Sequence, residues 1–181
     1  RMLAEHGADV LHLTAPHIPY QTELLYDTGP GKRCAWLDLD RPEGPGALRD
    51  LAARADVFLQ SYRPDALARR GFGAEALAEL RPGIVVTTLS AYGHDGPWAR
   101  RRGFDSVVQN AMGLAALNSS LEAPKNMPVQ ALDYIGGYLA ALGTILALAR
   151  RAREGGSWRV RVSLAQVAHW LAGLGAVDAT G

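Results

Sequence analysis

The chain has 181 residues, of which 48% are hydrophobic and 20% charged, and its formal net charge is +1. This composition is typical of a globular protein large enough to bury a core, and the charge balance gives no support for nucleic-acid binding driven by net charge. Cys34 is the single cysteine, which excludes an internal disulfide and a cysteine-built metal site and favours a reducing, cytoplasmic location.

Residues 1–90 alternate short apolar strands with helices. Residues 1–7 have the pattern of the second half of a helix that ends at Gly7. The pattern then predicts strands at 10–13, 34–39, 55–61 and 84–90, and helices at 46–54, 64–70 and 74–80. Turn-forming residues between the first two strands predict a loop. This alternation favours the α/β class, with an open parallel sheet flanked by helices.

After Tyr92 the pattern changes to a loop and long helices of the same large domain. Helices are predicted at 104–117 and 132–153, joined by a polar linker, and a strand at 158–162 leads into a helix at 164–174. The apolar part of the second helix is shorter than the roughly 20 residues that a membrane span needs, and it contains three glycines. We therefore expect a buried core helix and no membrane contact.

Several common site motifs are missing from the sequence. The segment DTGPGKRCA is preceded by Tyr26 where a phosphate-binding P-loop has its first glycine, and it has Arg33 in place of the Ser or Thr that binds magnesium. A G-x-G-x-x-G motif after a strand and a G-x-S-x-G motif are also absent. The five histidines form no i, i+4 pair and have no acidic partner at ligand spacing, so we expect no metal site.

Asp133 stands at the start of a predicted helix that is apolar or small almost throughout. Such a carboxylate can cap the helix by accepting hydrogen bonds from free backbone N–H groups. It can also be a nucleophile at the edge of a dry channel, where it attacks an activated acyl group. The local sequence leaves both roles open, and they are compatible if the helix-end N–H groups keep the carboxylate ionised.

The helix after Asp133 carries a stripe of small residues at positions i, i+4, i+7 and i+11: Gly136, Ala140, Gly143 and Ala147. Such a stripe admits the close approach of another backbone or of a slender ligand.

Two arginine clusters follow the third and fourth predicted strands. Their members are Arg63, Arg69 and Arg70, and Arg100, Arg101 and Arg102. Ligands of open parallel sheets bind beyond the carboxyl ends of the strands, and guanidinium groups there suit a phosphate. Runs of like charge are more often simply solvated, so charge alone does not decide between these interpretations.

Five ordered blocks of the sequence resemble the family III CoA-transferases, the group that includes formyl-CoA transferase and carnitine CoA-transferase. The blocks are LAEHGADV, GKRCAWLDLDRPEG, ADVFLQSYRPDALARRGFG, LSAYGHDGPWARRRGFD and LDYIGGYLAALGTILAL. The resemblance implies a Rossmann-like CoA-binding region over residues 1–130. It implies a catalytic helix, with the strand and helix that follow, over residues 131–181, where the link to a second domain begins.

The resemblance implies an enzyme in which Asp133 attacks the thioester of an acyl-CoA donor. The products of that step are an aspartyl mixed anhydride and free CoA thiolate, and the thiolate then converts the anhydride into an aspartyl-CoA thioester. A carboxylic acid acceptor completes the exchange. CoA, as acyl-CoA, is the only cofactor implied, and no metal is.

The resemblance also implies a set of CoA-binding residues: Leu37, Ser61, Tyr62, Ala66, Arg69 and Arg102. In the family, the loop matching Ser61 to Ala66 holds the nucleotide, the two arginines bind phosphate, and the strand that carries Leu37 lines the adenine. The family's usual Asn and Gly are replaced by Ser61 and Asp65 here. A carboxylate near a phosphate implies an altered affinity for CoA.

Two alternatives stay open beside the transferase. An α-methylacyl-CoA racemase of the same fold would have a histidine where Phe104 stands, and phenylalanine cannot transfer a proton, so the transferase is favoured. The other alternative is an inactive CoA-binding fragment, because the family implies a longer protein and we expect this chain to be incomplete. The family implies an interlocked homodimer that acts on acyl-CoA and a small carboxylic acid, without nucleic-acid or membrane partners.

Overall fold

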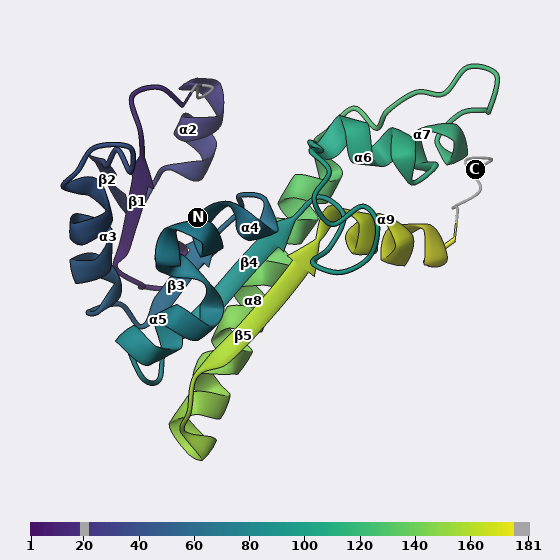
Figure 1. The fold of residues 1–181 in the computed structure, drawn as a ribbon. Helices are drawn as coiled ribbons and strands as arrows, with labels where there is room; N and C mark the ends of the chain where they lie inside the picture. Colours follow the sequence, from purple (N-terminus) through teal and green to yellow (C-terminus); the bar gives the residue numbers. More distant parts are fainter. Residues whose placement is uncertain (19–21, 176–181) are drawn as a thin grey trace. The chain divides into compact units, whose positions relative to one another are not determined.

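The computed structural model describes residues 1–18 and 22–175. The chain forms two compact units, Arg1–Ala55 and Asp56–Gly181, and each is described here by itself. Figure 1 shows the helices and strands of both units in sequence colours.

The first unit is a small parallel α/β unit. Its elements are α1 (Met2–Glu5), β1 (Val10–Thr14), α2 (Thr22–Thr28), β2 (Lys32–Trp36) and α3 (Gly44–Ala52). Strands β1 and β2 pair in parallel along their whole length, from Val10 opposite Lys32 to Thr14 opposite Trp36. Helix α3 buries Leu48 and Ala52. Gly44 is required at its start, because a Cβ there would lie 2.0 Å from the Asp38 carbonyl oxygen.

The second unit is built on a three-stranded parallel sheet with the order β3-β4-β5. Its elements are β3 (Val57–Gln60), α4 (Pro64–Leu67), the π-helical turn η1 (Ala68–Phe72), α5 (Ala74–Leu80), β4 (Val85–Ser90), α6 (Asp105–Ala111), α7 (Leu114–Leu117), α8 (Ala131–Glu154), β5 (Trp158–Ser163) and α9 (Leu164–Gly173). The central strand β4 is buried almost throughout, as its β-branched sequence predicts.

Helix α8 packs lengthwise on strands β4 and β5 through its stripe of small residues. A Cβ at Gly143 would lie 2.7 Å from Val160 Cγ1, and one at Gly136 would lie 3.1 Å from Leu89 Cδ1. Thr144 Oγ1 is 2.7 Å from Thr87 Oγ1 across the same interface. The stripe therefore serves the packing of a helix on a sheet. Among the described residues, α8 is the one helix that is long and apolar enough to cross a membrane, and a third of its apolar window is buried.

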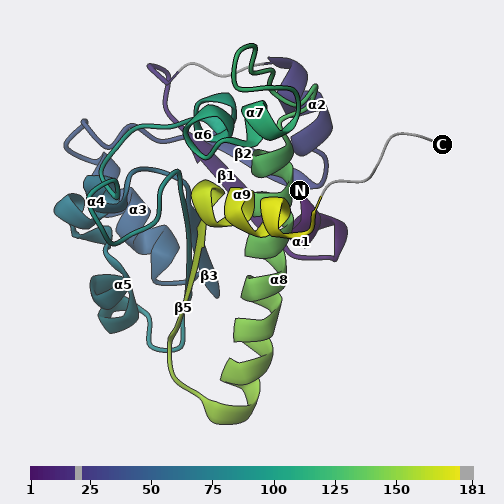
Figure 2. The same ribbon diagram turned by 90° about the vertical axis from the view of Figure 1, so that its right-hand side faces the viewer.

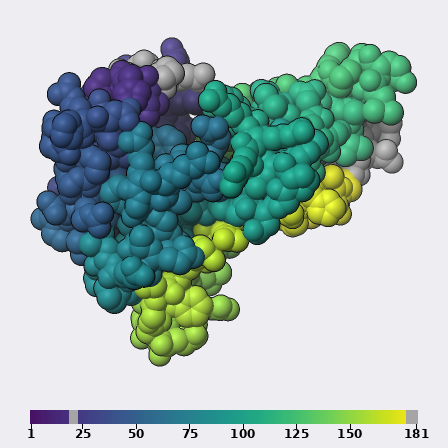
Figure 3. Space-filling model, in the orientation of Figure 1, coloured from purple at the N-terminus to yellow at the C-terminus, as the bar shows by residue number. Residues whose placement is uncertain are grey.

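A second core lies where helices α6, α7, α8 and α9 meet beyond the carboxyl ends of the strands. Its buried members are Val108, Leu114, Leu132, Leu164, Val167 and Ala168. Figure 2 shows α9 crossing the half of α8 that begins at Ala131. At the other end of α8, the turn to β5 protrudes at the lower edge of the second unit in Figure 3. Gly155 and Gly156 adopt positive φ angles of 68° and 74° there, which favours glycine.

The predicted α/β class with parallel strands and flanking helices is confirmed, and the structure adds that the strands lie in two sheets, one in each unit. Three local expectations were wrong. Helix α2 occupies part of the predicted loop, and β2 begins at Lys32 and ends at Trp36, so Leu37 follows the strand. The single helix predicted at 104–117 is divided into α6 and α7 because Gly113 has a positive φ of 79°.

Candidate active site

Asp133 lies in the first turn of α8, which begins at Ala131. Its backbone N–H donates a hydrogen bond of 2.9 Å to Oδ2 of Asp105. The carboxylate that accepts from the first turn of this helix is therefore that of Asp105, and the structure shows no capping hydrogen bond for the Asp133 side chain, one of the two roles that the sequence left open. Among residues 1–18 and 22–175, the Asp133 carboxylate has no hydrogen-bond or ion-pair partner.

Asp105 is held in place by a buried polar network. The residue is 1% exposed, and Gln109, also 1% exposed, donates from Nε2 to Asp105 Oδ1. Gln109 in turn accepts a 2.8 Å hydrogen bond from the Met127 N–H and donates to the Val129 carbonyl at 3.3 Å. The network joins α6, the segment before α8 and the first turn of α8, so it fixes where Asp133 lies.

Two effects raise the pKa of Asp133 to about 6: its removal from water, which is the larger, and repulsion by the Asp105 carboxylate. Asp133 as a whole residue is nevertheless exposed to solvent. The expectation that helix-end N–H groups favour its ionised form was wrong, because its surroundings disfavour that form. At neutral pH the group is largely ionised, yet it is more basic than an ordinary aspartate, which suits a nucleophile.

The two arginine clusters meet around a cavity of about 90 Å³. It is lined by Arg63, Pro64, Asp65, Ala66, Arg69 and Arg100. Asp65 lies between two of the arginines, with Oδ2 2.9 Å from Arg100 Nε and 3.6 Å from Arg69 Nη2. The segments after two neighbouring parallel strands thus converge on one cationic hollow.

The structure brings only part of the expected CoA-binding set to this hollow. Ala66 and Arg69 line it, whereas Ser61, Tyr62 and Arg102 are exposed residues outside its lining. Leu37 belongs to the first unit, where its N–H donates to the Thr14 carbonyl at 2.8 Å.

The hollow is also lined by two arginines of the predicted clusters that the resemblance did not assign to CoA, Arg63 and Arg100. Only the convergence of the two loops identifies them as lining residues.

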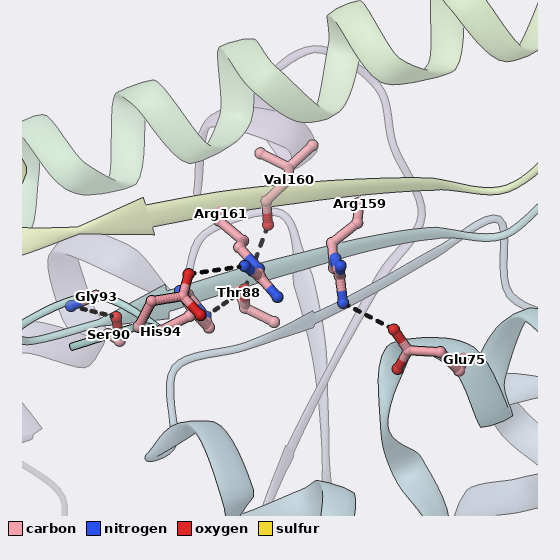
Figure 4. A network of polar contacts seen from close by, with 9 residues as sticks. Glu75, Thr88, Ser90, Gly93, His94, Arg159, Val160 and Arg161 are labelled. Atoms are coloured by element: carbon pink, nitrogen blue, oxygen red, sulfur yellow. Dashed lines mark hydrogen bonds and ion pairs between the residues drawn. The ribbon is translucent and has the colours of Figure 1, made fainter. Parts of the chain in front are cut away.

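A larger cavity of about 600 Å³ lies between the loop after β4, strand β5 and helix α9. Figure 4 shows the polar contacts beside it, in which Thr88 Oγ1 is 2.8 Å from His94 Nε2 and 3.3 Å from the Val160 carbonyl oxygen. Arg161 pairs with Asp95 at 3.3 Å. Burial, and then Arg161, lower the pKa of His94. The histidine is therefore neutral at physiological pH and fastens the loop to the sheet.

The first unit holds a group of possible metal ligands that sequence spacing did not reveal. His17, Asp38 and Asp40 place one ligand atom each within 4.8 Å of one another. Asp38 also accepts a 3.0 Å hydrogen bond from the Asp40 N–H and lies 3.8 Å from Arg41 Nε.

The chain is similar to several known proteins over most of its length. It is 35% identical to the acetyl-coenzyme A transferase nodX of Hypoxylon pulicicidum, over 94% of this chain and 30% of that protein. It is 33% identical to the human alpha-methylacyl-CoA racemase, over 85% of this chain and 40% of that protein. The solved structure of the protein Rv3272 from Mycobacterium tuberculosis matches with a TM-score of 0.85 and 29% identity, over 95% of this chain and 51% of the other.

The chain thus spans about half or less of the length of these relatives. The sequence model of CoA-transferase family III matches residues 1–180, nearly the whole chain. The α/β fold with parallel strands and the five ordered sequence blocks agree with that match. This chain belongs to CoA-transferase family III.

Proposed function

We propose that the protein containing this chain moves CoA from an acyl-CoA donor to a carboxylic acid acceptor, with Asp133 as the nucleophile. The observation that carries this proposal is the Asp133 carboxylate itself. It lies at the start of α8 without a partner in the described part of the chain, its N–H is anchored by Asp105, and its pKa is raised to about 6. A carboxylate held in this way is available for covalent chemistry.

In the proposed reaction, an oxygen of Asp133 attacks the thioester carbonyl carbon of the donor. The carbon–sulfur bond breaks, and the CoA thiolate leaves an aspartyl mixed anhydride. The thiolate then attacks the aspartyl carbonyl carbon, which releases the donor acid and leaves an aspartyl-CoA thioester. The acceptor carboxylate repeats the first step on this thioester, and the thiolate attacks the acceptor carbonyl to give the new acyl-CoA and free Asp133. Each intermediate keeps an activated acyl group.

In this proposal, the positive charge that binds a phosphate of CoA comes from three arginines, Arg63, Arg69 and Arg100. Guanidinium groups form strong, charge-assisted hydrogen bonds with phosphate, and a hollow of about 90 Å³ is a few water volumes in size, roughly that of one phosphate group. The proposed contacts to other parts of the nucleotide in this unit are Ser61, Tyr62 and Arg102.

The experiment that tests the nucleophile is the capture of its covalent adduct. The purified protein is incubated with acyl-CoA donors and analysed by mass spectrometry, and we expect an added acyl or CoA mass on the peptide that contains Asp133. An Asp133→Asn variant should form no adduct and should lose CoA transfer. Full transfer activity in that variant would contradict the proposal.

The similarity to the human racemase makes racemisation the second candidate function. Phe104 argues against it, since an exposed phenyl ring cannot serve as an acid or base. The two functions differ in one measurement. A racemase exchanges the α-proton of a 2-methylacyl-CoA with deuterium from D₂O, whereas a transferase moves CoA to a second acid and leaves that proton in place.

A further inference from the structure

Asp65 is an acidic residue placed inside a cationic site. Its Oδ2 atom contacts Arg100 Nε at 2.9 Å and lies 3.6 Å from Arg69 Nη2, so one carboxylate oxygen serves two guanidinium groups. The side chain of Asp65 is 38% exposed, and those of Arg69 and Arg100 are 73% and 79% exposed. The three groups are therefore within reach of a ligand in solution.

The carboxylate occupies the position relative to these arginines that an oxygen of a bound phosphate would take. A guanidinium group directs its N–H donors at carboxylates and phosphates in the same geometry. A phosphate that enters the hollow must therefore displace the Asp65 carboxylate or approach beside it against like charge. Either route lowers the affinity of the site for an anion.

We propose that Asp65 is an internal competitor for the phosphate of CoA, and that it sets the affinity of the arginine-lined hollow for that phosphate. This inference rests on the proposed function, which supplies CoA as the ligand. It goes further by assigning control of the affinity for CoA to a residue that would not touch the reacting atoms. Asp65 holds Arg69 and Arg100 together while CoA is absent and releases them as the phosphate binds.

The test compares the CoA affinity of the purified protein with that of an Asp65→Asn variant by isothermal titration calorimetry. Asparagine keeps the size of the side chain but removes its charge. Because exposed ion pairs contribute modestly, we expect CoA to bind on the order of tenfold more tightly to the variant, and the gain to shrink as salt screens the charges. Asp65→Glu keeps the charge and should bind CoA nearly as the unaltered protein does.

An Asp95→Asn variant is the matched control, because Asp95 pairs with Arg161 outside this hollow. It changes the net charge by the same amount and should leave the affinity for CoA unchanged. Pantetheine, which lacks the nucleotide phosphates, should gain nothing from Asp65→Asn. If dephospho-CoA shows the same gain as CoA, the phosphate in the hollow belongs to the diphosphate, and otherwise it is the 3′-phosphate.

Three results would each overturn the inference while leaving the proposed function intact. The first is an affinity for CoA that Asp65→Asn does not change, the second is an equal gain in affinity in Asp95→Asn, and the third is an equal gain for pantetheine. Failure of the unaltered protein to bind CoA at all would overturn the proposed function together with the inference. Thermal unfolding of each variant shows that the fold is kept.

Discussion

The backbone N–H of Asp133 is bonded to the buried carboxylate of Asp105 at 2.9 Å, so two acidic residues share the start of one helix. The contact has opposite effects on the two parts of Asp133. Asp105 anchors the backbone of Asp133 by a charge-assisted hydrogen bond, and its charge makes the side chain of Asp133 harder to ionise. Position and basicity of the proposed nucleophile are therefore coupled.

The first prediction concerns the pH dependence of CoA transfer. Asp105→Asn keeps an oxygen acceptor for the Asp133 N–H but removes the neighbouring charge. We expect the acid limb of the pH–rate profile to lie near pH 6 in the unaltered protein, from the pKa of Asp133, and to move to lower pH in the variant. The pKa read from this limb should stay above that of a free aspartate, because desolvation is the larger cause of the raised pKa. An unchanged limb would show that Asp105 acts only on the backbone.

The second prediction concerns stability. The pKa of Asp133 is raised from 3.8 to about 6 on folding, so the folded state binds the proton more tightly than the unfolded state does. The free energy of unfolding contributed by this group is therefore highest below pH 3.8, falls as the pH rises from 3.8 to 6, and is constant above that window. After allowance for its contact with solvent, Asp133→Asn should stabilise the fold at pH 8 by about 1 kcal/mol. Urea unfolding at pH 8 measures this, and a destabilised variant would contradict it.

The third prediction concerns the arginines. Arg69→Ala and Arg100→Ala should each weaken CoA binding by about 1 to 3 kcal/mol if they form charged hydrogen bonds with phosphate. Arg102→Ala tests the resemblance in the same titration, because Arg102 lies outside the lining of the hollow. Arg159→Ala is the control, since that arginine pairs with Glu75 at 2.9 Å away from the hollow. Unchanged affinity in both Arg69→Ala and Arg100→Ala would remove the hollow from the CoA site.

The fourth prediction concerns two glycines of α8. Gly143→Ala places a Cβ 2.7 Å from Val160 Cγ1, so the helix or the Val160 side chain must shift, and we expect a loss of about 1 to 3 kcal/mol in the free energy of unfolding. Gly137→Ala meets no atom within 4 Å and should stabilise the same helix by about 0.5 to 1 kcal/mol. Chemical denaturation gives the free energy of unfolding of the two variants, and their difference separates the effect of packing from that of helix propensity. Equal effects would show that α8 is not packed closely on β5.

The sequence was a good guide where one periodicity dominated. β4 is β-branched and apolar, and α8 combines small and apolar residues over many turns, so local preference and burial agreed. Helix α2 is short and ends beside Gly29, in a segment dense with turn-forming residues, and its pattern gave too weak a signal. The break between α6 and α7 depends on the positive φ of Gly113, which the sequence permits but does not require.

The candidate site, too, was predictable from the sequence only in part. Asp133 and the arginine clusters stand out in the sequence by their charge and their place after strands. The pairing of Asp105 with the Asp133 N–H joins residues 28 positions apart, and the pairing of Asp65 with Arg100 joins the segments that follow two different strands. Such contacts depend on how the chain folds in three dimensions, which spacing along the sequence cannot indicate.

The hydrogen bond between Thr87 and Thr144 also sets the axial position of α8. Thr144 donates to the Ala140 carbonyl, so Thr87 is the donor across the interface, and both buried hydroxyl groups are satisfied. A slide of the helix by one turn, about 5.4 Å, would leave a buried hydroxyl unpaired. Asp133 lies 11 residues, or about 16 Å, along the same rigid rod. The contact between two buried threonines thus also fixes how far along the sheet the Asp133 carboxylate lies.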